Sequence, residues 1–293
     1  MRIGVAGIGK MGAAIAARLV ELGHEVAVWN RTPEKAKAVR GAAAVATPAE
    51  LAQRCEAVIT ILTDAPALEA VYNGPSGLLS GDVGGKLFVE MSTVLPATEV
   101  ALAEVVRAKG AAFVECPVGG STGPARQGKL IGLMGAEAAD AARARPILEQ
   151  LCRRLEHAGP VGSGAVLKFT INLPLMVYWQ ALGEALALAK SLPLEPARLL
   201  DLLGDTSGGP NVLKVRGAGV ASMLKGGNAG PVTFSVDSGI KDMQAMLAEA
   251  KTRGVDLPLV ERALGCYEEA RRHRSGGAEI STVSVYWANR NKR

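Results

Sequence analysis

Residues 2–29, RIGVAGIGKMGAAIAARLVELGHEVAVW, decide the fold of this chain. An apolar run at residues 2–6 leads into the glycine-rich turn GIGKMG at residues 7–12, and a second apolar run occupies residues 25–29. Between them, small and apolar residues recur at helical spacing over residues 11–22. The order of strand, glycine turn, helix and strand predicts a βαβ unit, in which the two strands lie parallel in one sheet.

The glycine-rich turn is typical of a dinucleotide-binding site. The glycines of this turn permit a tight bend and bring backbone N–H groups against a pyrophosphate at the N-terminus of the following helix. A glycine turn with a purely structural role is the alternative, but the flanking strands and helix favour nucleotide binding. The candidate contacts in this turn are Gly7, Ile8, Gly9, Lys10 and Met11.

The end of the second strand predicts which dinucleotide binds. An NAD site usually carries Asp or Glu there, which hydrogen-bonds the adenosine ribose. This chain has Asn30, Arg31 and Thr32 instead, followed by Lys35, and all four are candidate cofactor contacts. Arg31 can pair with a 2′-phosphate and lie on the adenine, while Thr32 and Lys35 add donors. We therefore expect NADP(H) to be preferred over NAD(H), although a merely solvated Arg31 would leave the preference open.

Strands and helices alternate through the first half of the chain. Apolar runs at residues 57–62, 86–91, 112–115 and 130–134 predict strands, and residues 32–40, 66–71 and 96–109 have helical patterns. This predicts an α/β Rossmann domain with a parallel, doubly wound sheet over residues 1–162. The rest predicts helices only: a long interdomain helix at residues 163–191 and an all-α domain at residues 192–293. Breaks in the helical pattern fall at residues 204–210, 226–231, 254–258 and 275–277.

The composition is that of a globular protein. Of the 293 residues, 48% are hydrophobic and 21% are charged, which provides material for a core and argues against disorder. The net charge of +5 favours small anionic ligands, but scattered basic residues and few aromatics (4%) argue against nucleic acid. The four cysteines lack the spacing of a zinc site or a disulfide framework, so we expect a reducing, cytoplasmic setting. The most apolar stretch, residues 169–183, is too short to span a membrane.

Lys168 and Asn172 are the candidate catalytic residues. Lys168 lies near the start of the long apolar helix, for which Ser163 is a candidate N-cap. A lysine on a buried helix is costly unless it is paired or functional, and the nearby helix N-terminus is expected to lower its pKa, which suits a proton shuttle. Asn172 follows at i+4 and can orient a substrate oxygen. A lysine that extends to solvent beside a surface asparagine is the alternative.

Other side chains carry weaker signals. Residues 115–124, ECPVGGSTGP, form a loop of glycines and hydroxyls that suits a small carboxylate, although a tight turn has the same composition. Cys116 has no evident histidine partner and fits a buried thiol better than a nucleophile. His24 and His157, each placed in a turn, and His273, in a basic patch, are expected to be surface or packing residues.

Taken together, four segments resemble the β-hydroxyacid dehydrogenase family, and they cover essentially the whole chain. They are, in the family's order, the dinucleotide motif at residues 7–12, the substrate loop at residues 115–120, the motif G-x-x-x-K-x-x-x-N at Gly164, Lys168 and Asn172, and the K-D motif at Lys241-Asp242. By itself, Lys241-Asp242 would indicate only a solvated pair on a helix. Because all four motifs occur together and in the family's order, they are a specific signal of this resemblance.

The resemblance implies a Rossmann domain, a long helix and a helical domain like that of 6-phosphogluconate dehydrogenase, which binds substrate and forms homodimers or dimers of dimers. It implies that Lys168 is the general acid in reduction and that Lys241 closes over the cofactor. Leu62, Thr63 and Thr93 match positions that contact the cofactor in the family. The candidate substrate contacts are Gly119, Gly120, Ser121, Thr122, Lys168 and Asn172.

The substrate loop departs from the family's usual pattern. The family commonly reads D-A-P-V-S-G-G, whereas Glu115 and Cys116 replace the first two residues here. Gly119 replaces the serine that helps to hold the substrate carboxylate in the family. Ser121 and Thr122 can supply replacement hydroxyl groups, and the backbone N–H of residue 120 remains.

Residues 30–32 and 124–130 look most like the glyoxylate/succinic semialdehyde reductase branch. We therefore expect an NADPH-dependent reductase that interconverts a small semialdehyde or 2-oxo acid and its hydroxy acid. A 3-hydroxyisobutyrate or tartronate semialdehyde-type dehydrogenase and an NADPH-dependent imine reductase stay open, although imine reductases usually lack a lysine at this position. A chromatin-type protein with an inactive dehydrogenase domain is disfavoured by Lys168. No metal, nucleic acid or membrane partner is expected.

Overall fold

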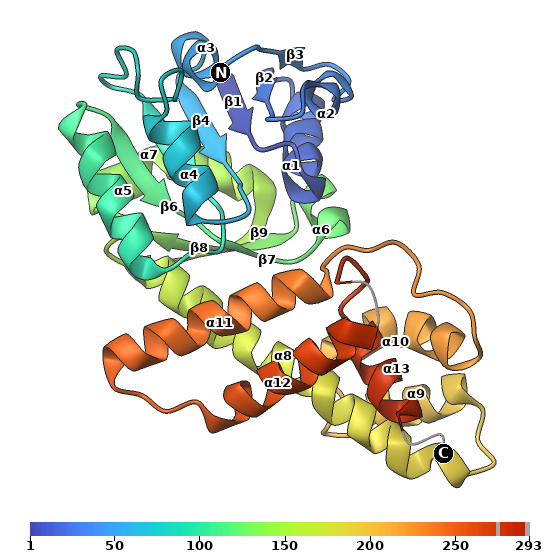
Figure 1. The fold of residues 1–293 in the computed structure, drawn as a ribbon. Coiled ribbons are helices and arrows are strands. Elements are labelled where there is room, and N and C mark those ends of the chain that lie inside the picture. The colour runs from blue at the N-terminus through green and yellow to red at the C-terminus, as the bar shows by residue number, and fades with distance from the viewer. Residues whose placement is uncertain (274–275, 291–293) are drawn as a thin grey trace. The chain divides into compact units, whose positions relative to one another are not determined.

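The computed structural model describes residues 1–273 and 276–290 (Figure 1). The chain divides into two compact units, Met1–Phe169 and Thr170–Arg293, and the division falls inside the long helix α8, Ser163–Leu188. The first unit is α/β with a Rossmann-like, mostly parallel sheet, and the second is mostly helical. These features confirm the predicted fold class.

The first unit is built around a nine-stranded sheet. Its strands are β1 (Arg2–Ala6), β2 (Glu25–Trp29), β3 (Ala43–Ala44), β4 (Ala57–Thr60), β5 (Leu87–Glu90), β6 (Ala112–Glu115), β7 (Val118–Gly119), β8 (Leu130–Gly135) and β9 (Cys152–Gly159). They follow the order β3-β2-β1-β4-β5-β6-β8-β7, with β9 paired to β8. Strands β1 to β6 pair parallel, as predicted, whereas β8 runs antiparallel to β6 and β7.

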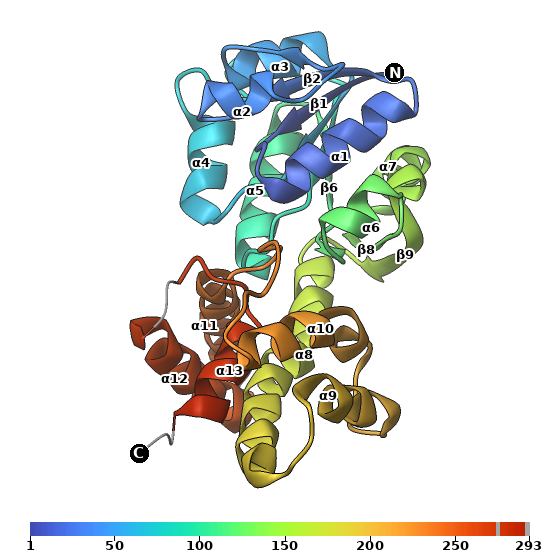
Figure 2. The ribbon, with the colours of Figure 1, turned by 90° about the vertical axis from the view of Figure 1, so that its right-hand side faces the viewer.

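Helices cover both faces of this sheet (Figure 2). They are α1 (Lys10–Glu21), α2 (Pro33–Lys37), α3 (Pro48–Arg54), α4 (Ala65–Asn73), α5 (Pro96–Ala108), α6 (Thr122–Arg126) and α7 (Ala138–Leu151). Side chains alternate along the central strands: Ile59 and Val89 pack with α1 and α7, whereas Val58 and Phe88 pack with α3, α4 and α5. Because both faces are buried, these strands are continuous apolar runs in the sequence.

The structure corrects two predictions in the first unit. A helix was predicted over residues 32–40, but α2 is shorter and spans only Pro33–Lys37. His157 lies within β9 and not in a turn, and its Nε2 is 2.9 Å from the carbonyl oxygen of Ala136. Most side chains of β9 are exposed or half-buried, so its sequence lacks the apolar run that marks the inner strands.

The second unit consists of most of α8 followed by shorter helices. These are the 3-10 turn Ala189–Ser191, α9 (Pro196–Asp205), α10 (Asn211–Leu224), α11 (Val236–Arg253), α12 (Pro258–His273) and α13 (Thr282–Asn289). The predicted breaks at residues 204–210, 226–231 and 254–258 are confirmed, while Ser275, in the fourth, lies outside the described residues. None of the helices in the described part of the chain has a stretch long and apolar enough to cross a bilayer.

Candidate functional site

The glycine-rich turn lies between β1 and α1, at the carboxyl end of the parallel strands. Gly7 has φ 99°, and a Cβ there would lie 2.3 Å from the carbonyl oxygen of Ile61. A Cβ at Gly12 would lie 1.9 Å from the carbonyl oxygen of Gly7. By contrast, the Cβ position of Gly9 has no atom of the described chain within 4 Å. Gly7 and Gly12 are therefore required by the packing, and Gly9 leaves open space that fits a pyrophosphate.

The start of α1 lies in the glycine-rich turn, directly after Gly9. Gly9 is the N-cap and, as a glycine, has no side chain that could cap the helix. Nearby, Asn30 accepts a hydrogen bond from the N–H of Ile8 through its Oδ1 (2.9 Å) and donates to the carbonyl of Thr32 (3.0 Å). Asn30 thus ties the end of β2 to the turn. The backbone N–H groups at a helix N-terminus and the helix dipole suit the phosphates of a dinucleotide.

The residues after β2 that were predicted to choose between NAD and NADP are accessible. Arg31, Thr32 and Lys35 are all exposed, and Asn30 is half-buried. Thr32 is the N-cap of α2, but its side chain makes no capping hydrogen bond to another described residue. A basic side chain therefore stands where a ribose-binding carboxylate would stand in an NAD site.

The loops after β4 and β5 are joined by side chains that the sequence analysis missed. Ser92 accepts a hydrogen bond from the N–H of Leu62 (2.8 Å), and its own N–H donates to both carboxylate oxygens of Glu90 (3.0 and 2.9 Å). The hydroxyl of Ser92 also donates to Glu90. The joined loops carry the predicted cofactor contacts Leu62, Thr63 and Thr93; Thr63 is exposed, and the other two are half-buried. The sequence signal was a carboxylate at the end of an apolar strand, Glu90, followed after Met91 by two hydroxyl residues, Ser92 and Thr93.

Lys168 is a buried lysine held by the loop that follows β6. Its side chain lies on the second turn of α8 and is 8% exposed. Its Nζ donates a hydrogen bond to the carbonyl oxygen of Val118 (2.8 Å), in the strand β7 of that loop. The alternative of a lysine extended to solvent is therefore wrong. A primary amine at this position can donate a proton to an oxygen bound over the loop.

The prediction that Ser163 caps α8 is also corrected. The helix begins at Ser163, and the carboxylate of Glu115 accepts the backbone N–H groups of Gly162 (2.8 Å) and Gly164 (2.5 Å). Glu115 is fully buried, and burial raises its pKa to about 7, with the backbone N–H groups acting in the opposite direction. A capping side chain 47 residues away along the chain cannot be recognised from local spacing.

The loop that was predicted to bind a small carboxylate contains β7 and leads into α6. Gly120 has φ 124°, a conformation that favours glycine. Ser121 and Thr122 are half-buried, and Ser121, at the N-cap position of α6, makes no capping bond through its side chain to the described chain. Gly119 lies in β7 and contributes no side chain. Ser121 and Thr122, two and three positions after Gly119, carry the hydroxyl groups of this loop.

In the second unit, Asn172 is held by a residue that the sequence analysis undervalued. Asn172 is buried, and its Nδ2 donates to Oδ2 of Asp242 (3.2 Å), which is 2% exposed. The other oxygen of Asp242 lies 3.3 Å from Nζ of Lys241. A solvated Lys241-Asp242 pair is therefore the wrong interpretation, because Asp242 is a buried acceptor that orients the Asn172 amide. The clue was its position next to the apolar stripe of α11.

The remaining polar candidates are structural. His24 Nε2 is 2.8 Å from Oε1 of Gln150, and His273 stacks on Tyr286. Cys116 is a fully buried free thiol whose pKa burial raises well above its usual range, which confirms the packing interpretation. Over residues 1–273 and 276–290, no cluster of histidine, cysteine or carboxylate side chains could hold a metal ion.

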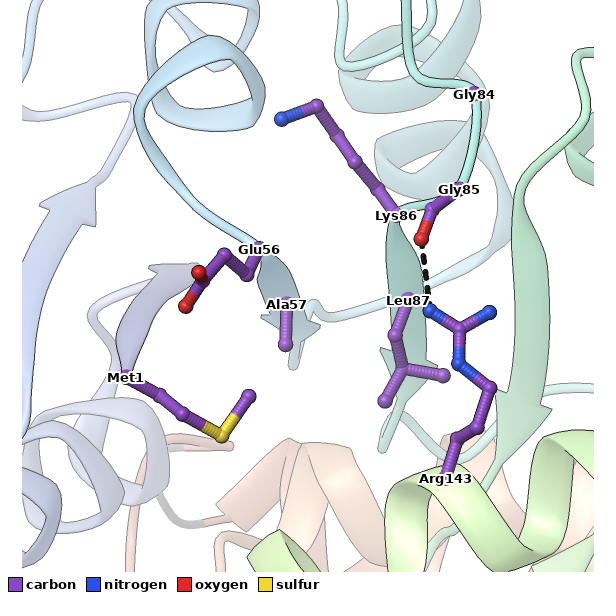
Figure 3. A pocket seen from close by; sticks show the side chains of 8 residues that line it. All are labelled: Met1, Glu56, Ala57, Gly84, Gly85, Lys86, Leu87 and Arg143. Atoms are coloured by element: carbon purple, nitrogen blue, oxygen red, sulfur yellow. Dashed lines mark hydrogen bonds between the residues drawn. The ribbon is translucent and has the colours of Figure 1, made fainter.

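A pocket of about 390 Å³ lies elsewhere on the first unit (Figure 3). It is lined by Ala57 and Leu87, the first residues of β4 and β5, and so lies at the amino ends of the strands. Figure 3 shows Arg143 donating to the carbonyl of Gly85 (2.7 Å). Lys86 donates to the carbonyl of Cys55 (2.8 Å). Ligands of open α/β sheets bind at the carboxyl ends, so this pocket is not the predicted site.

Comparison with known proteins assigns the family. Residues 2–159 match the model of the NAD binding domain of 6-phosphogluconate dehydrogenase, and residues 162–286 match that for NAD-binding of NADP-dependent 3-hydroxyisobutyrate dehydrogenase. The chain is 33% identical over 285 residues to glyoxylate/succinic semialdehyde reductase 1 of Arabidopsis thaliana, with 97% of each chain covered. It is 34% identical over 257 residues to 3-hydroxyisobutyrate dehydrogenase of Pseudomonas aeruginosa, with 86% of each covered.

A solved structure agrees with these matches. The 3-hydroxyisobutyrate dehydrogenase of Mycobacterium tuberculosis superposes with a TM-score of 0.83 at 25% identity, covering 97% of this chain and 98% of that one. The relatives are oxidoreductases, and the matched domains bind nicotinamide dinucleotides. The chain therefore belongs to the β-hydroxyacid dehydrogenase family of oxidoreductases.

Proposed function

We propose that this protein is an NADPH-dependent reductase that interconverts a small semialdehyde or 2-oxo acid and its hydroxy acid. The observation that carries the proposal is the buried Lys168, whose Nζ lies against the substrate loop at Val118. The full-length similarity to a glyoxylate/succinic semialdehyde reductase adds support for the substrate class.

The residues at the carboxyl ends of the strands fit a dinucleotide. The N–H groups of the turn formed by Gly7, Ile8, Gly9, Lys10 and Met11 would bind its pyrophosphate. The loops that carry Leu62, Thr63 and Thr93 would bind the portion nearer to the nicotinamide, and Lys241 would close over it. A reduced nicotinamide bound there supplies a hydride to the substrate carbon.

Lys168 has the role of proton donor. Reduction of a carbonyl places negative charge on its oxygen, and a protonated amine can neutralise this charge by transferring a proton. The hydrogen bond from Nζ to the carbonyl oxygen of Val118 holds the Lys168 side chain at the substrate loop. Asn172, with its Nδ2 bound to Asp242, would align the substrate oxygen through its amide.

Two features favour NADPH and an anionic substrate. Arg31, exposed at the end of β2, can form a bidentate pair with the 2′-phosphate, with Thr32 and Lys35 beside it. The substrate carboxylate would be held by the N–H of Gly120 and the hydroxyl groups of Ser121 and Thr122, because Gly119 has no hydroxyl group. Lys168 and Asn172 complete the proposed substrate contacts.

The test is a panel of initial rates of NADPH oxidation, with NADH in parallel. The aldehydes are glyoxylate, succinic semialdehyde, tartronate semialdehyde and methylmalonate semialdehyde, and the cyclic imine is 1-pyrroline. We expect turnover of at least one acidic aldehyde with NADPH preferred. Turnover of the imine alone would replace the proposal by an imine reductase, an outcome that Gly119 in the substrate loop would explain. Turnover with NADH preferred would refute the role of Arg31.

We also propose that the enzyme works in the cytoplasm as a homodimer or a dimer of dimers. The four buried free thiols suit a reducing compartment. Leu188 and Val215 in the helical unit are 87% and 74% exposed, and contact with another copy of the chain would remove such side chains from water. Light scattering coupled to size-exclusion chromatography tests the assembly, and a monomer at micromolar concentration would refute it.

A further inference from the structure

Glu115 links the substrate loop to the helix that carries Lys168. It is the last residue of β6, directly before the loop, and its side chain is fully buried. Its Oε1 accepts hydrogen bonds from the N–H groups of Gly162 (2.8 Å) and Gly164 (2.5 Å), at the start of α8. A carboxylate at a helix N-terminus also interacts favourably with the helix dipole.

Two glycines make the space that this carboxylate fills. Gly135 in β8 pairs with Glu115 in the sheet, and a Cβ there would lie 2.1 Å from Oε1 of Glu115. A Cβ at Gly164 would lie 2.3 Å from the carbonyl oxygen of Leu133 and 3.0 Å from Oε1 of Glu115. This explains in physical terms the glycine of the G-x-x-x-K motif: it lets α8 begin in contact with β8 and the Glu115 carboxylate.

A second bond joins the same loop and helix. One turn after Gly164, Nζ of Lys168 donates to the carbonyl of Val118, three residues beyond Glu115. The start of α8 and the segment from Glu115 to Val118 are therefore held together at two points. A shift of the first turn of α8 would move Lys168 relative to the substrate loop.

Glu115 is not optimised for stability in its surroundings. Its Oε2 is buried and has no hydrogen-bond partner among the described residues. Burial raises the pKa of Glu115 to about 7, the N–H groups of Gly164, Gly162 and Ala165 act to lower it, and the charge of Glu90 adds to the rise. A titratable side chain that is buried away from water and whose pKa is shifted in this way is typical of functional sites.

We propose that Glu115 is a positioning residue for catalysis, whose carboxylate fixes the first turn of α8 and thereby holds Lys168 at the substrate loop. The proposal rests on the proposed function, in which Lys168 donates the proton. Glu115 itself contacts neither substrate nor cofactor in this account, and it acts only through the helix.

The test combines hydrogen exchange with kinetics on the full-length protein. Backbone exchange of the peptide covering residues 160–169 is measured without cofactor at about pH 8, where Glu115 is ionised. Glu115→Ala should speed exchange of the amides of Gly162 and Gly164 by ~10-fold or more, because two charge-assisted hydrogen bonds are lost. Glu115→Gln keeps one acceptor oxygen and should restore protection to within ~3-fold of the wild type.

Kinetics then separate positioning from folding. Glu115→Ala should lower kcat for aldehyde reduction by ~10-fold or more while the Kd for NADPH changes less than ~3-fold, because Lys168 is displaced and the phosphate turn is not. Glu115→Gln should recover most of kcat. Thr47→Val is the matched control, because it removes the N-cap bond of α3 to Glu50 in the same unit (3.1 Å) and should change exchange only in α3.

Several outcomes would overturn the proposal. Unchanged exchange at residues 162–164 in Glu115→Ala, with only a lower melting temperature, would reduce Glu115 to a packing residue. Faster exchange with unchanged kcat would show that the first turn of α8 does not position Lys168. Failure of the proposed function is distinguishable, because Lys168→Met would then retain kcat while the exchange result for Glu115 still stood.

Discussion

Replacing Glu115 by glutamine should reduce the dependence of stability on pH. The pKa of Glu115 rises from 4.5 in the unfolded chain to about 7 in the folded protein, chiefly because the group is buried. The folded state therefore binds the proton more tightly. The resulting stability is fully present below the unfolded pKa of 4.5 and is lost as the pH rises through about 7.

The magnitude follows from the same two pKa values. A difference of 7 minus 4.5 corresponds to about 3 kcal/mol over the complete titration, at 1.36 kcal/mol for each unit of pKa. Between pH 5.5 and pH 8.5, the linkage relation gives a loss of about 2 kcal/mol from this group. Glu115→Gln cannot ionise, so its unfolding free energy should fall by about 2 kcal/mol less than that of the wild type over this range.

Urea unfolding followed by circular dichroism, at both pH values, measures this difference directly. Subtracting the two proteins removes most of the contribution of other groups, including Glu90 and Glu99, whose pKa values burial also raises. Glu56→Gln is the control. The pKa of the exposed Glu56 is lowered, so this group titrates below the pH range of the experiment. The unfolding free energy of Glu56→Gln should therefore depend on pH as that of the wild type does. Equal pH dependence in Glu115→Gln and the wild type would refute the reasoning.

Three further predictions concern the cofactor site. Arg31→Ala should raise the Kd for NADPH, measured by fluorescence titration, by ~10- to 100-fold and leave that for NADH within ~3-fold, because a charge-assisted pair with the 2′-phosphate is lost; equal effects on both cofactors would contradict it. Ser92→Ala should lower the free energy of unfolding by about 1–3 kcal/mol in urea melts, because the N–H of Leu62 loses its acceptor; an unchanged midpoint would contradict it. Gly12→Ala should cost about 1–3 kcal/mol of stability, because its Cβ meets a carbonyl oxygen, whereas Gly9→Ala should preserve stability and weaken NADPH binding; equal melting temperatures for the two variants would contradict this assignment.

Much of the fold could be predicted from the sequence because its signals are local. The turn between Gly7 and Gly12 is flanked by the strands and helix that such a turn requires, and the inner strands are apolar runs because both of their faces are buried. Strand β9 and helix α7 were missed for the opposite reason. The exposed residues of β9 have no hydrophobic period, and α7 contains Pro146, which usually interrupts a helical pattern.

The candidate site was predictable to the extent that its residues lie in contiguous motifs. Lys168 stood out because a charged side chain interrupts an apolar helix, and its burial agrees with that argument. Glu115 and Asp242 did not stand out as partners, because each acts on a residue 47 or 70 positions away in the sequence. Burial and pairing at such separations depend on the assembled fold, and no local period encodes them.

The most direct test of the proposed chemistry is the single-turnover rate of NADPH oxidation by Lys168→Met, with whichever aldehyde the wild type reduces. Methionine fills a similar volume at this buried position and has no transferable proton, while Lys168→Arg keeps a donor for Val118 but is a poor acid. The account predicts that the rate falls by ~10²- to 10⁴-fold in Lys168→Met, with the Kd for NADPH unchanged. A rate within ~3-fold of the wild type would contradict the claim that Lys168 donates the proton.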